Sequence, residues 1–167
     1  TAPGQFVNVA IEGKFLRRPI SVCDYDEQTI TLLYDVVGEG TKYMSTLPEG
    51  AELDLLTGLG NGFDTEVECQ RPLLLGGGVG IAPMLNLAKV LAGQGKKPVV
   101  IAGCNTAADA VVAELFEQSG AEVYVATVDG SVGTKGFVTD VMKDTDYSYF
   151  YTCGPEPMLK AVYRTSV

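Results

Sequence analysis

The stretch Leu73–Pro83, LLLGGGVGIAP, joins three consecutive leucines to a run with four glycines in five positions. The leucines predict a short buried strand, because strands that are covered on both faces read as continuous apolar runs. Consecutive glycines leave room for a ligand against the main chain, and the free N–H groups of a following helix attract phosphate. The stretch therefore predicts a strand, a nucleotide-binding loop and a helix. A tight turn without a ligand is the alternative.

This glycine loop departs from the standard dinucleotide fingerprint. The pattern G-x-G-x-x-G requires a third glycine where this chain has Ile81. The acidic residue expected about twenty positions later is also missing, because the next predicted strand ends Ala102-Gly103-Cys104. We therefore expect a nucleotide site of a different lineage.

The chain after the glycine loop alternates apolar strands with helices, a pattern typical of βαβ crossovers and a parallel sheet. The first helix should end near Gly93. Further strands are expected at 99–102, 122–126 and 147–153, and further helices at 107–119, 138–142 and 156–163. The last strand ends at Cys153-Gly154, which should face the same crevice as the glycine loop, since ligands lie beyond the carboxyl ends of parallel strands. An inert buried thiol is the alternative reading of Cys153.

The first part of the chain has a different pattern, with short strands separated by turn residues. Val7, Val9 and Ile11 alternate with other residues, 29–37 is apolar and β-branched, and 51–56 follows a turn. This pattern predicts an antiparallel barrel or sandwich. The change of pattern at Cys69–Pro72 divides the chain into domains 1–70 and 71–167, a two-domain β + α/β fold. We expect the barrel to be incomplete and the chain to be a fragment, since it opens at Thr1 without a leader.

Composition excludes several classes of function. A net charge of −9 disfavours binding to nucleic acid or anionic lipid, and no apolar run is long enough to span a bilayer. The chain has no histidine, which excludes histidine-based triads and the common zinc sites. Its four cysteines are dispersed, so the spacing predicts no metal site in this chain and reduced thiols in the cytoplasm.

Two segments of the first domain could hold a second phosphate. Arg17 and Arg18 precede Pro19-Ile20-Ser21, and arginine is a good bidentate phosphate ligand. The turn Val37–Lys42 contains Gly40 and Thr41 and precedes a helix expected at 41–47, whose N–H groups could bind another phosphate. Together they suggest a second nucleotide. A solvated basic pair and a plain turn are the alternatives.

These motifs resemble those of the ferredoxin-reductase superfamily, in which a barrel holds FAD and an α/β domain holds NAD(P). The motifs RPIS, GLGNGF, DGSVGTKGFVTD and CGPEPM are more narrowly similar to the electron-transfer subunits of type B dihydroorotate dehydrogenase, a family of pyrimidine biosynthesis. They occupy residues 18–21, 58–63, 129–140 and 153–158. The similarity covers nearly the whole chain.

The resemblance implies a set of cofactor contacts. The FAD contacts would be Arg18, Pro19, Ile20, Ser21, the strand Leu33-Tyr34-Asp35, and the pyrophosphate-binding Gly40 and Thr41. The NAD contacts would be Gly77, Gly78 and Gly80, with Cys153 and Gly154 near the nicotinamide. Where this chain has Asp35, family members often have arginine, so the contact expected there is with the backbone.

The resemblance also implies how electrons flow. They would come from dihydroorotate oxidation in a partner subunit that contains FMN, within a heterotetramer, and pass through a [2Fe–2S] cluster and FAD to NAD⁺. The cluster's four clustered cysteines are absent from this chain, so the cluster is expected only in the intact protein. The chemistry would be carried by the cofactors, which is compatible with the absence of histidine.

The choice of dinucleotide can be argued from charge. Asp129 follows the third predicted strand, and a carboxylate there would accept a hydrogen bond from a ribose hydroxyl and repel a 2′-phosphate. We therefore expect NAD; a turn-favouring Asp before Gly is the alternative. Two rival functions remain open, namely a related ferredoxin–NAD(P) reductase subunit and a non-catalytic nucleotide-binding redox module.

Overall fold

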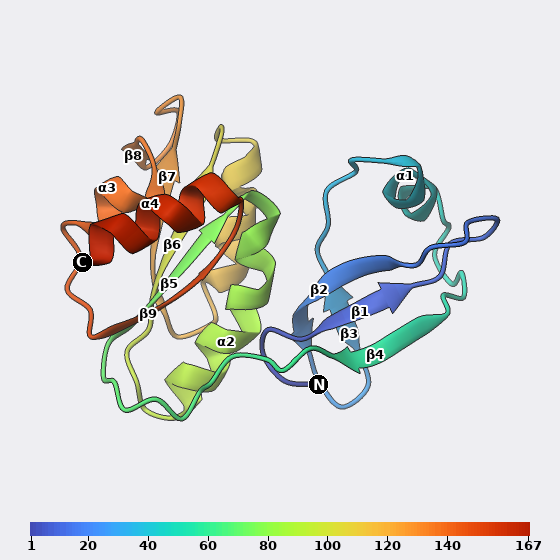
Figure 1. The fold of residues 1–167 in the computed structure, drawn as a ribbon, viewed down its shortest axis with the longest axis horizontal. Helices are drawn as coiled ribbons and strands as arrows, with labels where there is room; N and C mark the ends of the chain where they lie inside the picture. The colour runs from blue at the N-terminus through green and yellow to red at the C-terminus, as the bar shows by residue number, and fades with distance from the viewer.

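The computed structural model describes all 167 residues and places them in two sheets that lie side by side (Figure 1). Four strands form the first sheet: β1 (Phe6–Val9), β2 (Arg18–Tyr25), β3 (Ile30–Leu32) and β4 (Leu55–Leu59). The second contains β5 (Pro72–Gly77), β6 (Val99–Cys104), β7 (Glu122–Thr127), β8 (Thr134–Lys135) and β9 (Tyr149–Cys153). The helices are α1 (Glu39–Ser45), α2 (Ala82–Gly93), α3 (Val138–Met142) and α4 (Glu156–Ser166), with 3₁₀ segments η1 (Gly78–Ile81) and η2 (Asp109–Phe116).

The first sheet is antiparallel, in the order β3-β2-β1-β4. Val7 and Val9 on β1 are fully buried, and with Ile11, Val22 and Met44 they form a small core under α1. This confirms the alternation read from the sequence, because residues two apart on a strand share one face. The edge strands β3 and β4 do not pair with each other, so the sheet is open and forms no closed barrel.

The second sheet is parallel, in the order β8-β7-β6-β5-β9. Leu73, Leu74 and Leu75 on β5 have no exposed surface, as expected for a central strand with helices on both faces. The order reverses at β5, because β6 lies on one side of it and β9 on the other. In an open sheet of this kind, the reversal marks the crevice where ligands bind.

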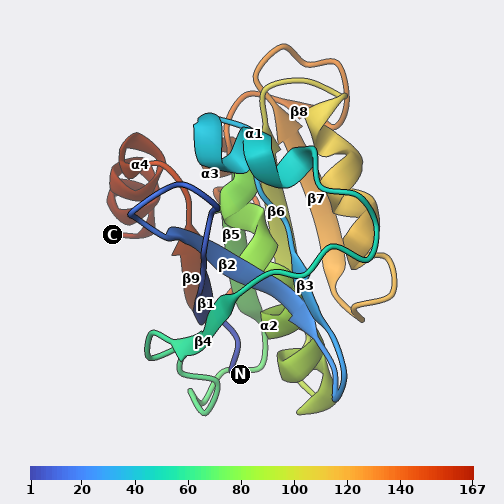
Figure 2. The same ribbon diagram turned by 90° about the vertical axis from the view of Figure 1, so that its right-hand side faces the viewer.

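Helices cover both faces of the parallel sheet (Figure 2). On one face, α2 and η2 pack over Leu74 and Val100, and on the other, α3 and α4 pack over Leu73 and Leu75. Helix α2 also separates the two sheets, since it contacts β2 of the antiparallel sheet on its outer side.

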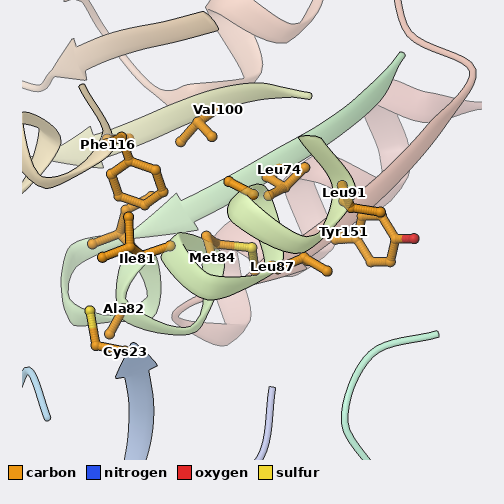
Figure 3. Close-up of a cluster of buried hydrophobic side chains, with 13 residues drawn as sticks. Cys23, Leu74, Ile81, Ala82, Met84, Leu87, Leu91, Val100, Phe116 and Tyr151 are labelled. Carbon is orange, nitrogen blue, oxygen red and sulfur yellow. The ribbon is translucent and has the colours of Figure 1, made fainter. Parts of the chain in front are cut away.

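The core beneath α2 extends across both sheets. Cys23, near the end of β2, is 1% exposed and belongs to the same cluster as Ala82 and Met84 of α2 (Figure 3). Phe63, which follows β4, packs edge-on against Tyr151 of β9, with ring centroids 5.7 Å apart. The two sheets therefore share buried apolar surface.

The fold class predicted from the sequence is confirmed, with three local corrections. The strand expected at 51–56 is instead Leu55–Leu59, because residues 51–54 are exposed and the pairing with β1 involves Leu55, Leu56 and Leu59. The strand expected at 29–37 ends at Leu32, because Leu33 leaves the sheet edge and packs against the cluster around α2. The helix expected at 107–119 is the 3₁₀ segment η2, in which Ala110 and Phe116 are buried. No helix is long and apolar enough to cross a bilayer.

Candidate functional site

A cavity of about 650 Å³ opens at the carboxyl ends of β5, β6 and β9, where the strand order reverses. Its volume lies within the range of small-molecule and cofactor sites. Most of the wall comes from the loops that follow the parallel strands, and Leu33 and Asp35 of the first domain complete it. Both domains therefore line one cavity.

The glycine loop forms one end of this cavity. A Cβ at Gly76 would stand 2.5 Å from the Ile81 Cα, so only glycine lets the loop fold back on β5. Gly77 and Gly78 line the cavity, and Gly78 has a φ of +53° with nothing within 4 Å of where its Cβ would be. Open space over an exposed backbone is the cradle that a pyrophosphate requires, and the residues present here fit a dinucleotide.

Gly80 and Gly154 lie where the glycine loop meets the end of β9. A Cβ at Gly80 would stand 2.5 Å from the carbonyl oxygen of Cys153 and 2.8 Å from the Cα of Gly154. Gly80 does not line the cavity, so its missing side chain serves this close approach of two backbones. The approach fixes the loop against the strand that carries the predicted nicotinamide contact.

The thiol of Cys153 is half-buried beside the cluster under α2. Burial raises its pKa above the ordinary thiol value, which keeps it protonated at neutral pH. Only the thiolate is a strong nucleophile, so this environment does not suit a covalent catalyst. Neither Cys153 nor Gly154 lines the cavity, although Pro155, the next residue along the chain, does.

The far end of the cavity lies between the loops that follow β6 and β7. These loops are joined by hydrogen bonds: Val128 N donates to Cys104 O at 3.1 Å, and Ala107 N donates to Ser131 Oγ at 2.7 Å. Asp109 lines the cavity here, whereas Asp129 stands on the neighbouring loop, outside the lining. Hydrogen bonds from the Ser131 hydroxyl and backbone hold the pKa of Asp129 below its usual value, so it is charged at neutral pH.

Phe137 lines the cavity, although the sequence predicted no role for it. It is 63% exposed, and its backbone N–H donates to Asp140 Oδ2 at 2.9 Å, which fixes the residue at the start of α3. An exposed aromatic ring on a cavity wall offers a flat apolar surface for a base. Two signals could have identified such residues, namely the motif at 129–140 and the rule that loops after parallel strands bind ligands.

No basic side chain lines the cavity, whose charged residues are Asp35 and Asp109. A bound pyrophosphate would therefore be held by backbone N–H groups and not by an arginine or lysine. A second negative phosphate group would meet an acidic wall.

Arg17 and Arg18, adjacent in sequence, have different surroundings. Arg17 forms a bidentate pair with Asp54, at 3.1 and 2.7 Å, and ties β2 to the loop before β4. Arg18 makes no ion pair; it donates to Leu16 O at 2.7 Å and lies against Gly40, where a Cβ would stand 2.5 Å from its Nε. The structure thus brings the unpaired cation together with the glycine of the second candidate loop.

Gly40 and Thr41 lie in the first turn of α1 and are buried. The Thr41 hydroxyl accepts from Val37 N at 3.0 Å and Gly38 N at 3.2 Å, so it holds the turn that leads into the helix. The residues at this turn, with Arg18 beside them, fit a phosphate of a second nucleotide.

The remaining predicted flavin contacts lie along β2 and just after β3. Pro19, Ile20 and Ser21 pair with β1, and Ile20 packs against the small core of the first domain. Tyr34 also packs against that core, whereas Leu33 and Asp35 line the cavity. The predicted flavin contacts at residues 33–35 therefore lie partly on the core of the first domain and partly on the cavity wall.

The cysteines do not fit an iron–sulfur cluster. All four are free thiols, and three of them are buried. No three histidine, cysteine or acidic residues come close enough to hold a metal ion. A [2Fe–2S] cluster needs four clustered ligands, which these residues do not provide.

Comparisons with known sequences identify relatives of this chain. The family model for the oxidoreductase NAD-binding domain matches residues 74–164. The dihydroorotate dehydrogenase B (NAD(+)) electron transfer subunit of Fusobacterium nucleatum is 44% identical, with 96% of this chain and 66% of that protein covered. Its counterpart from Caldanaerobacter subterraneus is 45% identical, with 99% and 66% covered. The chain thus spans 66% of the length of these relatives.

Solved structures share the fold. The NADH-dependent reduced ferredoxin–NADP oxidoreductase, solved in a study of flavin-based electron bifurcation, matches with a TM-score of 0.87 and 32% identity, with 99% of this chain and 62% of that chain covered. The ferredoxin reductase in carbazole 1,9a-dioxygenase matches with a TM-score of 0.79 and 23% identity, with 98% and 55% covered. The resemblance indicated by the sequence motifs is confirmed.

Proposed function

This chain belongs to the oxidoreductase NAD-binding domain family, and from that membership we propose that it is the electron-transfer subunit of a type B dihydroorotate dehydrogenase. It would pass electrons from an FMN-containing, dihydroorotate-oxidising partner subunit to NAD⁺ by way of FAD, in the cytoplasm. The observation that carries the proposal is one cavity whose wall contains the glycine cradle of Gly77 and Gly78 together with Leu33 and Asp35, two of the predicted flavin contacts. The names of the relatives supply the partner and its substrate.

The residues of this chain would bind and orient the two cofactors. Gly77 and Gly78 would receive the NAD pyrophosphate, and Phe137 would pack against the adenine. Arg18 and the first turn of α1 would hold the FAD pyrophosphate. When bound, FAD and NAD supply hydride exchange between flavin and nicotinamide, so the chain needs no acid or base of its own.

Leu33 would shape the place where the two rings meet. It lines the cavity and packs against the cluster under α2, so the wall there is apolar and excludes water. Asp129 and Asp109 would disfavour a 2′-phosphate and so select NAD. The [2Fe–2S] cluster belongs to this proposal only for the whole protein, because the cysteines of this chain cannot ligate it.

A second candidate follows from the structure with a TM-score of 0.87: a subunit of an NADH-dependent ferredoxin–NADP oxidoreductase. Sequence identity favours the first, at 44% against 32%. The two candidates differ in the donor that reduces the flavin.

The test is to purify the intact protein with its co-expressed partner subunit and follow NADH formation from NAD⁺. Dihydroorotate should drive this reaction in the complex, and either subunit alone should not support it. Reduction of NAD(P)⁺ by reduced ferredoxin, without any response to dihydroorotate, would establish the second candidate. A complex that binds NAD but transfers electrons from neither donor would indicate a non-catalytic module.

A further inference from the structure

Two elements carry the proposed cofactor contacts, and they touch each other. β2 begins with Arg18–Ser21, the segment assigned to the flavin, and continues to Cys23 and Asp24. α2 follows directly from the glycine loop assigned to the dinucleotide. Because each element is rigid, a contact between them fixes the position of one cofactor site relative to the other.

Asp24 makes that contact with both carboxylate oxygens. Oδ1 accepts a hydrogen bond of 3.0 Å from Asn86 Nδ2, and Oδ2 pairs with Lys89 Nζ. Asn86 and Lys89 are three residues apart, so they lie on the same face of α2. Burial alone would raise the pKa of Asp24, but the bonds from Lys89 and Asn86 outweigh it and hold that pKa below its usual value.

The contact is distinct from the other polar contacts in the protein. Of the six salt bridges, five lie within one domain, and only Lys89–Asp24 joins the two sheets. Other bonds across the boundary go to the segment that connects the domains: Tyr151 Oη donates to Asp64 O at 2.7 Å, and Lys96 Nζ donates to Thr65 O at 2.7 Å. Those bonds hold the connecting segment, whereas Asp24 holds β2 itself.

Asn86 shows that this contact is built into the packed interface. Its residue is 6% exposed, and its amide nitrogen is committed to Asp24, which leaves the buried Oδ1 without a partner. An unpartnered buried acceptor is costly, and alanine or leucine at this position would avoid the cost. An apolar side chain could fill this position without that cost. The hydrogen bond from the Asn86 amide to Asp24 therefore offsets the cost of leaving Oδ1 unpartnered.

We propose that Asp24, through Asn86 and Lys89, is a positioning residue that holds the flavin-bearing strand against the dinucleotide-bearing helix and so sets the approach of nicotinamide to flavin. The proposal rests on the proposed function. Misplacement of reacting groups by about 1 Å can slow a reaction by about 10²-fold, so a loosened contact should act on the transfer step more than on binding.

The test compares Asp24→Asn and Lys89→Met with Lys160→Met, in the intact FAD-loaded protein. Lys160 is the matched control, because it pairs with Glu156 within α4. In the first two variants, flavin reduction at saturating NADH should slow by about tenfold or more, with the KM for NADH changed by less than about threefold. Lys160→Met should match the wild type in both quantities.

Hydrogen exchange on the same proteins gives a readout that does not depend on turnover. Amides of Cys23–Tyr25 and of the second turn of α2 should exchange faster in the Asp24 and Lys89 variants and not in the control. If Asp24→Asn does not fold, the rate and exchange of Lys89→Met test the proposal, since this variant keeps the hydrogen bond between Asn86 and Asp24. The double variant Asp24→Lys/Lys89→Asp should restore both readouts, because the pair is re-formed and Asn86 Oδ1 can then accept from the new lysine.

The outcomes separate the two proposals. Wild-type rates and wild-type exchange in both variants would overturn the role of Asp24 and leave the proposed function intact. If the wild-type flavin is not reduced by NADH, the proposed function fails. In that case faster exchange in the variants would still support the contact between the domains, and unchanged exchange would overturn it.

Discussion

At position 78 the backbone has a φ of +53° and open space where a side chain would point, whereas at position 80 a Cβ would stand 2.5 Å from the Cys153 carbonyl oxygen. Gly78→Ala should therefore cost about 1 kcal/mol of folding free energy for the left-handed conformation, but weaken NADH binding by about tenfold or more. Gly80→Ala should cost about 3 kcal/mol, because two backbones must separate.

Thermal unfolding and NADH titration of the two variants check this pair. Gly80→Ala should lower the free energy of unfolding more than Gly78→Ala does. Gly78→Ala should lose more affinity for NADH relative to the stability that it loses. If Gly78→Ala and the wild type bind NADH with equal affinity, Gly78 is not part of the NADH-binding site.

Asp129 offers a second test at the level of single residues. Asp129→Arg should raise kcat/KM for NADPH by about tenfold, which corresponds to ~1.4 kcal/mol, because a carboxylate is replaced by a phosphate ligand. Asp144→Arg makes the same charge change at an exposed position outside the cavity lining and should leave the ratio of NADPH to NADH unchanged. An unchanged ratio in the Asp129 variant would assign the selectivity elsewhere, with Asp109 as the first alternative.

At the scale of elements, the end of β2 predicts an alkaline limit to stability. Burial raises the pKa of the Cys23 thiol from 9.0 to about 11. The unfolded chain therefore releases this proton at lower pH than the folded protein does, so stability should fall as the pH rises from about 9 toward 11. Cys23→Ala should flatten this fall in denaturant unfolding curves, and a fall as steep as that of the wild type would assign it to other groups.

Elements with strong local signals could be predicted from the sequence. The leucines of β5, the glycine loop and the helix at 138–142 were identified because apolar runs and turn residues act locally. The ends of β3 and the 3₁₀ form of η2 depend on what packs against them. β3 ends at Leu32, and Leu33 packs against the cluster under α2. No sequence pattern within 29–37 indicates that contact.

The site was predicted in part for the same reason. Gly77 and Gly78 belong to the glycine motif, Leu33 and Asp35 were expected from the family resemblance, and all four line the cavity. The lining does not include four other predicted dinucleotide contacts, namely Gly80, Asp129, Cys153 and Gly154. Asp109 lies outside the quoted motifs, and Phe137 lies inside the motif at 129–140 but was given no role. Both are recognised as lining residues only once the fold brings their segments to the carboxyl ends of the parallel strands.

At the scale of the whole molecule, the arrangement of the two domains could not be predicted. It depends on contacts between residues far apart in the chain, such as Cys23 with Ala82, and Phe63 with Tyr151. This arrangement brings Leu33 and Asp35 to the cavity that the parallel sheet opens. The proposed hydride exchange requires such a shared cavity, since both cofactors must meet in it.

Rapid-mixing reduction of the intact, FAD-loaded protein by NADH tests most directly whether the two cofactors meet in this cavity. The flavin absorbance should bleach in a fast single phase at saturating NADH, and an equal concentration of NADPH should act at least about tenfold more slowly. Gly78→Ala should need more NADH to reach the same rate. A protein that retains FAD and binds NADH but shows no bleaching would contradict the claim that both domains bring their cofactors together in this cavity.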